Sequence, residues 1–351
     1  MTYITKPKLH HPALPKNDVG YTRRDYEGTV STLCAGCGHD SISAAIVQAC
    51  FELSIAPHRV AKLSGIGCSS KTPTYFLGNS HGFNTVHGRM PSVLTGANMA
   101  NRDLIYFGVS GDGDSASIGM GQFAHVVRRN LNMVYVVENN GCYGLTKGQD
   151  SATQDRGSAS RKGAPNPYSP IDLVGVALQL GATFVGRSFS GDKEQLVPLI
   201  KAAIMHKGFA FLDVVSPCVT FNNHAGSTKS YDYTRDHVKT GVVMDFVPHE
   251  EEITTKYDEG TTQEIILHDG SAIHLHKAES DYDPTNRLAA INKVQEYKDQ
   301  DKILTGLIYL DEEAAEFHEM LGTSDMAFNK MSDDELCPGA ETLGGINASY
   351  R

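Results

Sequence analysis

The sequence predicts an α/β fold in which a parallel sheet is covered by helices on both faces. Between residues 42 and 215, short apolar runs alternate with segments in which apolar residues recur at helical spacing. This alternation is typical of βαβ units, whose strands are parallel. Two polar turns, GDGD at 111–114 and ENN at 138–140, directly follow two of the apolar runs. Ligands of such sheets lie at the carboxyl ends of the strands, so these turns indicate a binding site.

The expected elements follow one another along the chain. The spacing of Ile42, Ala45, Ile46 and Ala49 predicts a helix over SISAAIVQACFEL. RVAKLSGIG is expected to be a strand that ends in a glycine turn, and a short helix in GANMAN precedes a strand that begins near residue 104. Further helices are predicted for IGMGQFAHVVRRN, IDLVGVALQL and EQLVPLIKAAIM, and further strands for LNMVYVV, ATFVGRS and FAFLDVV.

The two ends of the chain lack this alternation. Residues 1–30 are rich in Pro and Lys and are expected to form an extended arm, which leaves 31–235 as the main ligand-binding domain. After about residue 235, TTQEIILHDGSAIHLHKAES predicts a hairpin that turns at Asp269-Gly270. NRLAAINKVQEYKDQ predicts a helix, and LCPGAETLGGINASYR is expected to be a tail. We expect 236–351 to be a C-terminal extension that contacts another subunit.

Charge and composition exclude several classes of protein. The formal net charge is −10, which argues against binding to nucleic acid or to an anionic membrane. The chain has no run of about 18 apolar residues, so no membrane span is expected. The first residues lack the apolar core of a secretory signal, so a cytoplasmic location is expected. Seven cysteines in a reducing compartment favour metal ligation or buried thiols over disulfides.

The GDGD and ENN turns carry the groups that a magnesium–diphosphate site needs. Asp112 offers a carboxylate, and Gly111 and Gly113 let the backbone approach an anion. A helix beginning near Ser115 would add its amide groups and its dipole. Asn140 follows the next strand, one helix later, so it is expected to lie close to Asp112. A single GDG is most often an ordinary turn, but its combination with NN at the next strand end favours a metal site.

Four cysteines lie beside turns. Cys34 and Cys37 form a CxxC pair, which can serve zinc, redox chemistry or an iron–sulfur cluster. The chain has no second CxxC, so a zinc ribbon lacks its other half, and a thioredoxin-type motif would follow the first strand of a different pattern. With Cys68 and Cys218, four thiolates from separate loops can hold a cubane cluster. His39, which comes shortly after the CxxC pair, has no second histidine at metal-ligand spacing.

Taken together, these motifs resemble the 2-oxoacid:ferredoxin oxidoreductases, and specifically their beta subunit, which binds thiamine diphosphate. The GDG and NN pair by itself is similar to the diphosphate-binding motif of thiamine-diphosphate enzymes. CAGCGH, GIGCSS, HGR (87–89), GDGD, YGLTKGQ and SPC occur in the order of the oxidoreductase family, over about residues 28–235. The resemblance implies three cofactors, which are thiamine diphosphate, Mg²⁺ and one [4Fe–4S] cluster. The CxxCxxCxxxCP run of a ferredoxin-like module is missing, so no further cluster is expected.

The resemblance also implies roles for individual residues. Mg²⁺ would be bound by Asp112, by the Asn140 side chain and by the backbone carbonyl of Cys142. The cluster would be ligated by Cys34, Cys37, Cys68 and Cys218. The residues expected to contact the cofactor lie within these motifs or beside them. They are Gly67, His87, Arg89, Gly111, Asp112, Gly113, Asp114, Ile118, Asn140, Cys142, Gly144 and Leu145.

Two residues are candidates for a catalytic role. His87 lies in the HGR segment, and an ordinary polar loop is the alternative there. Lys147 is expected to pair with an anionic substrate group or a CoA phosphate, and a solvated lysine is the alternative. YGLTKGQ looks more similar to members of the family that act on 2-oxoglutarate, where Lys147 would serve the second carboxylate.

The activity that the resemblance implies is CoA-dependent oxidative decarboxylation of a 2-oxoacid. The leading substrate is 2-oxoglutarate, converted to succinyl-CoA and CO₂, with electrons passed through the cluster to ferredoxin or the reaction run in reverse. Pyruvate or another 2-oxoacid remains an alternative. A non-redox thiamine-diphosphate decarboxylase or synthase is a second alternative, but such an enzyme needs no cysteine set. A non-catalytic protein with a degenerate site is a third, and the intact expected ligands argue against it.

A partner subunit is expected as well. The sequence contains one sheet domain of the diphosphate-binding type, and no second domain that would supply the general-acid Glu near the pyrimidine ring. The resemblance therefore implies an alpha subunit that carries the pyrimidine domain and this Glu, in a heterotetramer of two alpha–beta pairs. Ferredoxin, CoA and the 2-oxoacid complete the expected partners.

Overall fold

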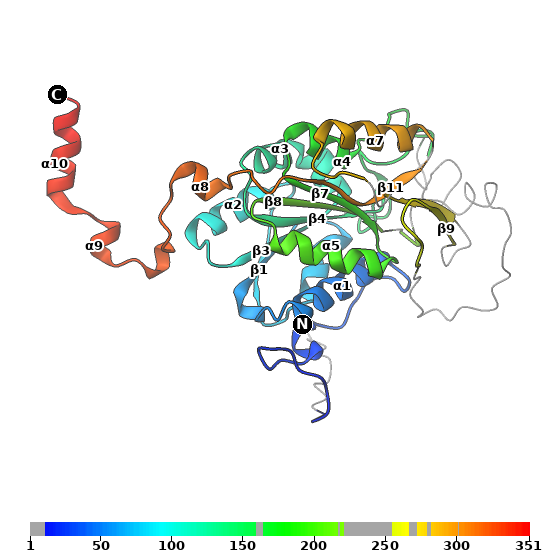
Figure 1. The fold of residues 1–351 in the computed structure, drawn as a ribbon, viewed down its shortest axis with the longest axis horizontal. Coiled ribbons are helices and arrows are strands. Elements are labelled where there is room, and N and C mark those ends of the chain that lie inside the picture. Colours follow the sequence, from blue (N-terminus) through cyan, green and yellow to red (C-terminus); the bar gives the residue numbers. More distant parts are fainter. Residues whose placement is uncertain are drawn as a thin grey trace.

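The chain forms one large sheet with helices on both faces (Figure 1). The structure, a computed structural model, describes residues 11–158, 164–216, 218–220, 255–266, 272–278, 282–300 and 302–351. Within these residues the sheet has nine strands in the order β2-β1-β3-β4-β8-β7-β11-β10-β9. None of the described helices is long and apolar enough to cross a bilayer.

Six neighbouring strands of this sheet are parallel, which confirms the predicted fold class. Those in the centre are buried on both faces, so they are apolar throughout rather than alternating. The strands are β2 (His81–Asn84), β1 (Val60–Ser64), β3 (Ile105–Gly111), β4 (Met133–Asn139), β8 (Phe209–Val215) and β7 (Phe184–Phe189). The carboxyl ends of β3 and β4 lie side by side, and they place the GDGD and ENN turns next to each other.

Helices cover both faces of the parallel strands and enclose two apolar cores. On one face, α1 (Gly38–Glu52) and α5 (Lys193–Met205) pack against each other and against the sheet. The other face is covered by a row of four: α2 (Met90–Ala100), α3 (Met120–Arg128), α4 (Leu173–Leu180) and α7 (Arg287–Asp299). The central strands bury side chains in both cores, as a doubly covered sheet requires.

The sheet continues past residue 235, into the expected C-terminal extension. β11 (Ile303–Leu310) pairs antiparallel with β7 and parallel with β10 (Ala272–Lys277). β10 in turn pairs antiparallel with β9 (Thr262–Ile266), which confirms the predicted hairpin, although its turn at Asp269-Gly270 lies outside the described residues. The sheet is therefore mixed rather than wholly parallel, because the chain re-enters it from the opposite direction at β11.

The two ends of the chain differ in their contacts with the sheet and its helices. Within the expected N-terminal arm, Tyr26 is fully buried, and its ring packs edge-on against Phe51 at 5.8 Å between centroids. The first ten residues of that arm lie outside the described residues. The expected C-terminal tail is in fact helical, with α9 (Asp333–Leu336) and α10 (Gly339–Ser349) following α8 (Phe317–Leu321). These last two helices are exposed and project away from the sheet (Figure 1).

Candidate active site

Asp112 lies at the carboxyl end of β3, is 1% exposed and accepts hydrogen bonds on both carboxylate oxygens. One oxygen accepts from the backbone amide of Asn140 at 3.2 Å. The other accepts from the hydroxyls of Ser151 and Thr153, both at 2.5 Å. The structure thus brings Asp112 and Asn140 together as expected. It adds two hydroxyl donors that the sequence did not predict, because nothing in their residue type distinguishes them from other serines and threonines.

The ENNGCYGLTKGQ segment folds back on itself after β4. The side-chain oxygen of Asn140 accepts from the backbone amide of Cys142 at 3.1 Å. β5 (Cys142–Tyr143) then pairs with β6 (Gln149–Asp150) to form a small hairpin. Lys147 lies in its loop with φ of 81°, a left-handed conformation that is uncommon for a non-glycine residue. Its side chain is exposed and lines neither of the two cavities described below.

A small, glycine-lined cavity of about 20 Å³ lies above Asp112 and Asn140. Tyr143 covers Gly113 and donates from its hydroxyl to the Gly113 carbonyl at 2.8 Å. A Cβ at Gly113 would lie 2.5 Å from the Tyr143 ring, so only glycine fits. The expected contact residues that line this cavity are Gly67, Gly111, Asp112, Gly113, Asp114, Asn140, Cys142 and Gly144. A short π-helical turn, Gly113–Ile118, begins at its edge, in place of the regular helix expected from Ser115.

The HGR segment does not line this cavity, but its glycine contacts a residue that does. The Gly88 amide donates to Asp114 at 2.6 Å, and the Ser110 hydroxyl donates to the other oxygen of the same carboxylate at 2.8 Å. The side chains of His87 and Arg89 do not line the cavity. Asp114 therefore binds the HGR loop within this chain.

The four expected cluster cysteines line a second cavity of about 200 Å³. They come from three segments: Cys34 and Cys37 before α1, Cys68 at the start of a short 3₁₀ turn, and Cys218 beyond β8. Burial raises the pKa of the Cys37 thiol, and it raises the pKa of Cys68 to about 11. No three His, Cys, Asp or Glu side chains in the described ranges are grouped closely enough to hold a single metal ion.

The two cavities share a wall. Cys68, Asn140 and Gly144 line both of them, and Leu145 lines the cysteine cavity. Behind this wall, His39 and Glu138 are buried, and both line the smaller cavity. Burial lowers the pKa of His39 to about 4 and raises the pKa of Glu138. Burial thus disfavours the charged form of both side chains.

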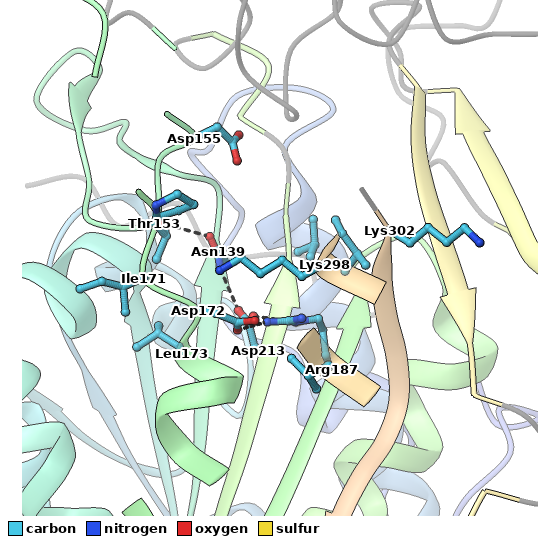
Figure 2. A pocket seen from close by; sticks show the side chains of 14 residues that line it. Asn139, Thr153, Asp155, Ile171, Asp172, Leu173, Arg187, Asp213, Lys298 and Lys302 are labelled. Carbon is cyan, nitrogen blue, oxygen red and sulfur yellow. Dashed lines mark hydrogen bonds and ion pairs between the residues drawn. The ribbon is translucent and has the colours of Figure 1, made fainter. Parts of the chain in front are cut away.

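A third cavity, of about 130 Å³, lies on the α7 side of the strand ends (Figure 2). The Arg187 guanidinium there binds two carboxylates: its Nη2 contacts Asp172, and its Nε lies 2.9 Å from Asp213. The side-chain amide of Asn139 donates to Asp213 at 3.0 Å, and its oxygen accepts from Thr153 at 3.3 Å. Because Thr153 also donates to Asp112, this network connects the buried ion cluster with the candidate metal ligand.

Comparisons with known families agree with this geometry. Residues 65–214 match the family model described as thiamine pyrophosphate enzyme, C-terminal TPP binding domain. Residues 272–325 match the model for the C terminal of the pyruvate ferredoxin oxidoreductase beta subunit. The first match contains the GDGD, ENN and YGLTKGQ segments, so this chain has a thiamine-diphosphate-binding domain. The second contains β10 and β11, which belong to the sheet, and α7, which packs against it.

Several curated proteins are similar in sequence. A Sulfolobus 2-oxoacid:ferredoxin oxidoreductase subunit beta is 42% identical over 191 residues, which are 54% of this chain and 63% of that protein. A Methanocaldococcus jannaschii 2-oxoglutarate synthase subunit KorB is 39% identical over 60% of this chain and 75% of its own length. A Mycobacterium tuberculosis 2-oxoglutarate oxidoreductase subunit KorB is 38% identical over 63% of this chain and 59% of its own. The matches thus span about three fifths to three quarters of these relatives.

A solved structure is similar over nearly the whole chain. It is the 2-oxoglutarate:ferredoxin oxidoreductase from Magnetococcus marinus with 2-oxoglutarate, coenzyme A and succinyl-CoA bound. The match has a TM-score of 0.68 and 31% identity, and it covers 90% of this chain and 94% of that one. With the shared motifs and the binding domain, this establishes that the chain belongs to the family of 2-oxoacid:ferredoxin oxidoreductase beta subunits.

Proposed function

We propose that this chain, together with an alpha subunit, catalyses the CoA-dependent oxidative decarboxylation of 2-oxoglutarate to succinyl-CoA and CO₂. Electrons would leave through a [4Fe–4S] cluster to ferredoxin. The relatives named for 2-oxoglutarate and the solved structure bound to 2-oxoglutarate and coenzyme A support this substrate. The match to a pyruvate ferredoxin oxidoreductase domain favours pyruvate as the second candidate.

The observation that carries the proposal is the wall between the two cavities. A cavity lined by four cysteines adjoins a glycine-lined cavity built around Asp112 and Asn140, and Cys68 contributes to both. A non-redox thiamine-diphosphate enzyme has no use for four thiols at this place. An oxidoreductase needs an electron acceptor beside the cofactor, and the shared wall supports that arrangement.

The oxygen ligands around the smaller cavity fit Mg²⁺ and a diphosphate. Mg²⁺ prefers carboxylate, amide and carbonyl oxygens together with phosphate oxygens. Asp112, the Asn140 side chain and the Cys142 carbonyl would supply them. The glycines that line the cavity would let the backbone approach the diphosphate. Ser151 and Thr153 would orient the Asp112 carboxylate from behind, since both donate to the same oxygen.

The cysteine cavity fits a cluster better than a single ion. The described side chains do not approach the spacing of a mononuclear site, yet four thiols face one cavity of about 200 Å³. A cubane cluster takes one cysteine at each iron, so its ligands are spread over the cluster surface. We assign Cys34, Cys37, Cys68 and Cys218 as these ligands. When bound, thiamine diphosphate supplies the carbon nucleophile for decarboxylation, and the cluster accepts electrons one at a time.

Some assignments depend on the alpha subunit. His87, Arg89 and Leu145 belong to segments that border the cofactor region, and we propose that they contact the cofactor or the substrate in the assembled enzyme. Lys147 would pair with the distal carboxylate of 2-oxoglutarate or with a CoA phosphate. We place the enzyme in the cytoplasm as a heterotetramer of two alpha–beta pairs, with the pyrimidine domain and its general-acid Glu supplied by the alpha subunit.

Anaerobic EPR of the co-purified complex, recorded before and after addition of 2-oxoglutarate and CoA, tests the proposal. We expect a reduced [4Fe–4S] signal that appears only with substrate. A signal with pyruvate but none with 2-oxoglutarate would keep the redox reaction and overturn the substrate. Iron-free protein that still consumes a 2-oxoacid would support a non-redox thiamine-diphosphate enzyme instead.

A further inference from the structure

A buried polar cluster lies behind the wall between the two cavities, and no proposed ligand role uses it. His39, Glu138 and Ser216 are each at most 1% exposed. His39 Nδ1 lies 2.6 Å from the Ser216 hydroxyl, and His39 Nε2 lies 3.7 Å from a Glu138 carboxyl oxygen. The Thr72 hydroxyl donates to the Ser69 carbonyl at 2.8 Å and lies 3.4 Å from the same Glu138 oxygen. Buried polar groups are unfavourable unless they are paired, so the short contact between His39 and Ser216 joins these two side chains specifically, with Glu138 beside them.

Each member of the cluster belongs to a segment that carries a proposed ligand. His39 is two residues after Cys37, Thr72 is four after Cys68, Glu138 is two before Asn140, and Ser216 is two before Cys218. One imidazole therefore contacts the segment of Cys218 through one nitrogen and that of Asn140 through the other. The contacts of Glu138 extend this connection to the segment of Cys68.

The packing around the cluster leaves little room for these segments to shift. A Cβ added at Gly38 would lie 2.4 Å from the Ser190 hydroxyl and 2.7 Å from the Ser216 hydroxyl. The first turn of α1 is therefore pressed against the ends of β7 and β8. Glu138 Oε1 has no hydrogen-bond partner among the described residues, and the side chain lines the cofactor cavity. A displacement of His39 would therefore change the positions of residues that line both cavities.

We propose that His39 is a positioning residue that fixes the spacing of the cysteine segments through Ser216 and couples them to the cofactor cavity through Glu138. The inference rests on the proposed function, because it requires that the four cysteines hold a cluster. Residues that support metal ligands from behind typically affect metal affinity about 10- to 100-fold. The chain places a histidine in such a supporting position next to a CxxC pair.

The test compares iron content and EPR spectra of the co-purified complex for wild type and His39 variants. In His39→Ala we expect roughly 10-fold lower cluster occupancy under limiting iron, and altered EPR g-values in the remaining clusters. His39→Asn places an amide nitrogen near the Nδ1 position, so it should retain the contact with Ser216 and recover most of the iron. His39→Gln reaches instead toward Glu138 and should recover less.

His318 provides a matched control. It is 4% exposed, its two ring nitrogens lie 2.6 Å from Asn98 and 2.7 Å from Thr323, and it lines neither of the two cavities. His318→Ala should lower thermal stability but leave iron content and g-values unchanged. If His39→Ala does not fold, Ser216→Ala, which removes only a hydroxyl, should still alter the EPR spectrum.

The outcomes separate the inference from the proposed function. An iron-loaded wild type, with unchanged occupancy and spectra in His39→Ala and Ser216→Ala, would overturn the positioning role alone. The positioning role would also be overturned if His318→Ala changed the spectra as much as His39→Ala. A wild-type complex that holds no iron would overturn the proposed function, and the positioning role with it.

Discussion

Replacing Arg187 by Met should destabilise the chain strongly, because it leaves two carboxylates without their counter-ion. The Arg187 side chain is 11% exposed, and that of Asp213 is 2% exposed. Asp172 binds the other side of the guanidinium. Removing one partner of a buried ion pair costs roughly 3–5 kcal/mol of unfolding free energy, and here one cation serves two anions. We therefore expect a loss near the upper end of this range, measured by chemical denaturation of the purified chain.

A surface ion pair provides the matched control. Lys256 contacts Glu194 at 3.2 Å, with side chains that are 79% and 58% exposed. Lys256→Met removes the same charge and should cost no more than about 1 kcal/mol, since exposed pairs contribute little. The triple variant Arg187→Met, Asp172→Asn, Asp213→Asn removes the stranded charges and should recover much of the lost stability. Equal effects of Arg187→Met and Lys256→Met would refute the reasoning.

The same substitution should weaken cofactor binding. Asp213 accepts from the Asn139 amide, the Asn139 oxygen lies 3.3 Å from the Thr153 hydroxyl, and Thr153 donates to Asp112. A supporting network of this kind affects metal affinity about 10-fold or more. Titration of the folded Arg187→Met variant with thiamine diphosphate and Mg²⁺ should show this loss. An unchanged dissociation constant would mean that Asp112 is oriented by Ser151 and the Asn140 amide alone.

Three further predictions concern the site and its acid stability. Asp112→Ala should abolish Mg²⁺-dependent binding of thiamine diphosphate while leaving iron content intact, because Asp112 does not line the cysteine cavity; parallel calorimetry and iron analysis check this. Lys147→Ala should lower kcat/KM for 2-oxoglutarate more than for pyruvate, and an unchanged ratio would contradict its role. Burial would raise the pKa of Asp172, but the charge and hydrogen bond of Arg187 outweigh it and lower this pKa. Its contribution to stability is therefore present above about pH 4 and lost as pH falls through the lowered value, so Asp172→Asn should flatten the acid branch of a stability–pH curve.

The parallel core of the fold was predictable because its signals are local. Strands β1, β3, β4, β7 and β8 are apolar runs, and the helices between them carry their own apolar period. β11 is equally apolar, but it pairs antiparallel with β7 far away in the sequence, and no local pattern specifies that partner. β2 was missed for the opposite reason. Its four residues are exposed and polar in pattern, so only pairing with β1 makes them a strand.

Candidate ligands can be proposed from sequence where one residue type has few other uses. Aspartate between glycines at a strand end, and cysteines beside turns, indicate ligands from the sequence alone. Ser151 and Thr153 could not be predicted in this way, because their role depends on the hairpin that folds them back onto Asp112. The same holds for Tyr143, whose ring occupies the space that a side chain at residue 113 would need. Such residues follow from the fold rather than from a motif.

The end of β4 takes part in two separate networks of polar side chains. Glu138, Asn139 and Asn140 are consecutive at the end of β4, yet each contacts a different group. Glu138 contacts His39 on the side of α1, where the cysteines lie. Asn139 contacts Asp213 on the side of α7, among the buried ions. Because successive side chains of a strand point to opposite faces, the two supporting networks stay apart, while Asn140 lies between them in the wall that both cavities share.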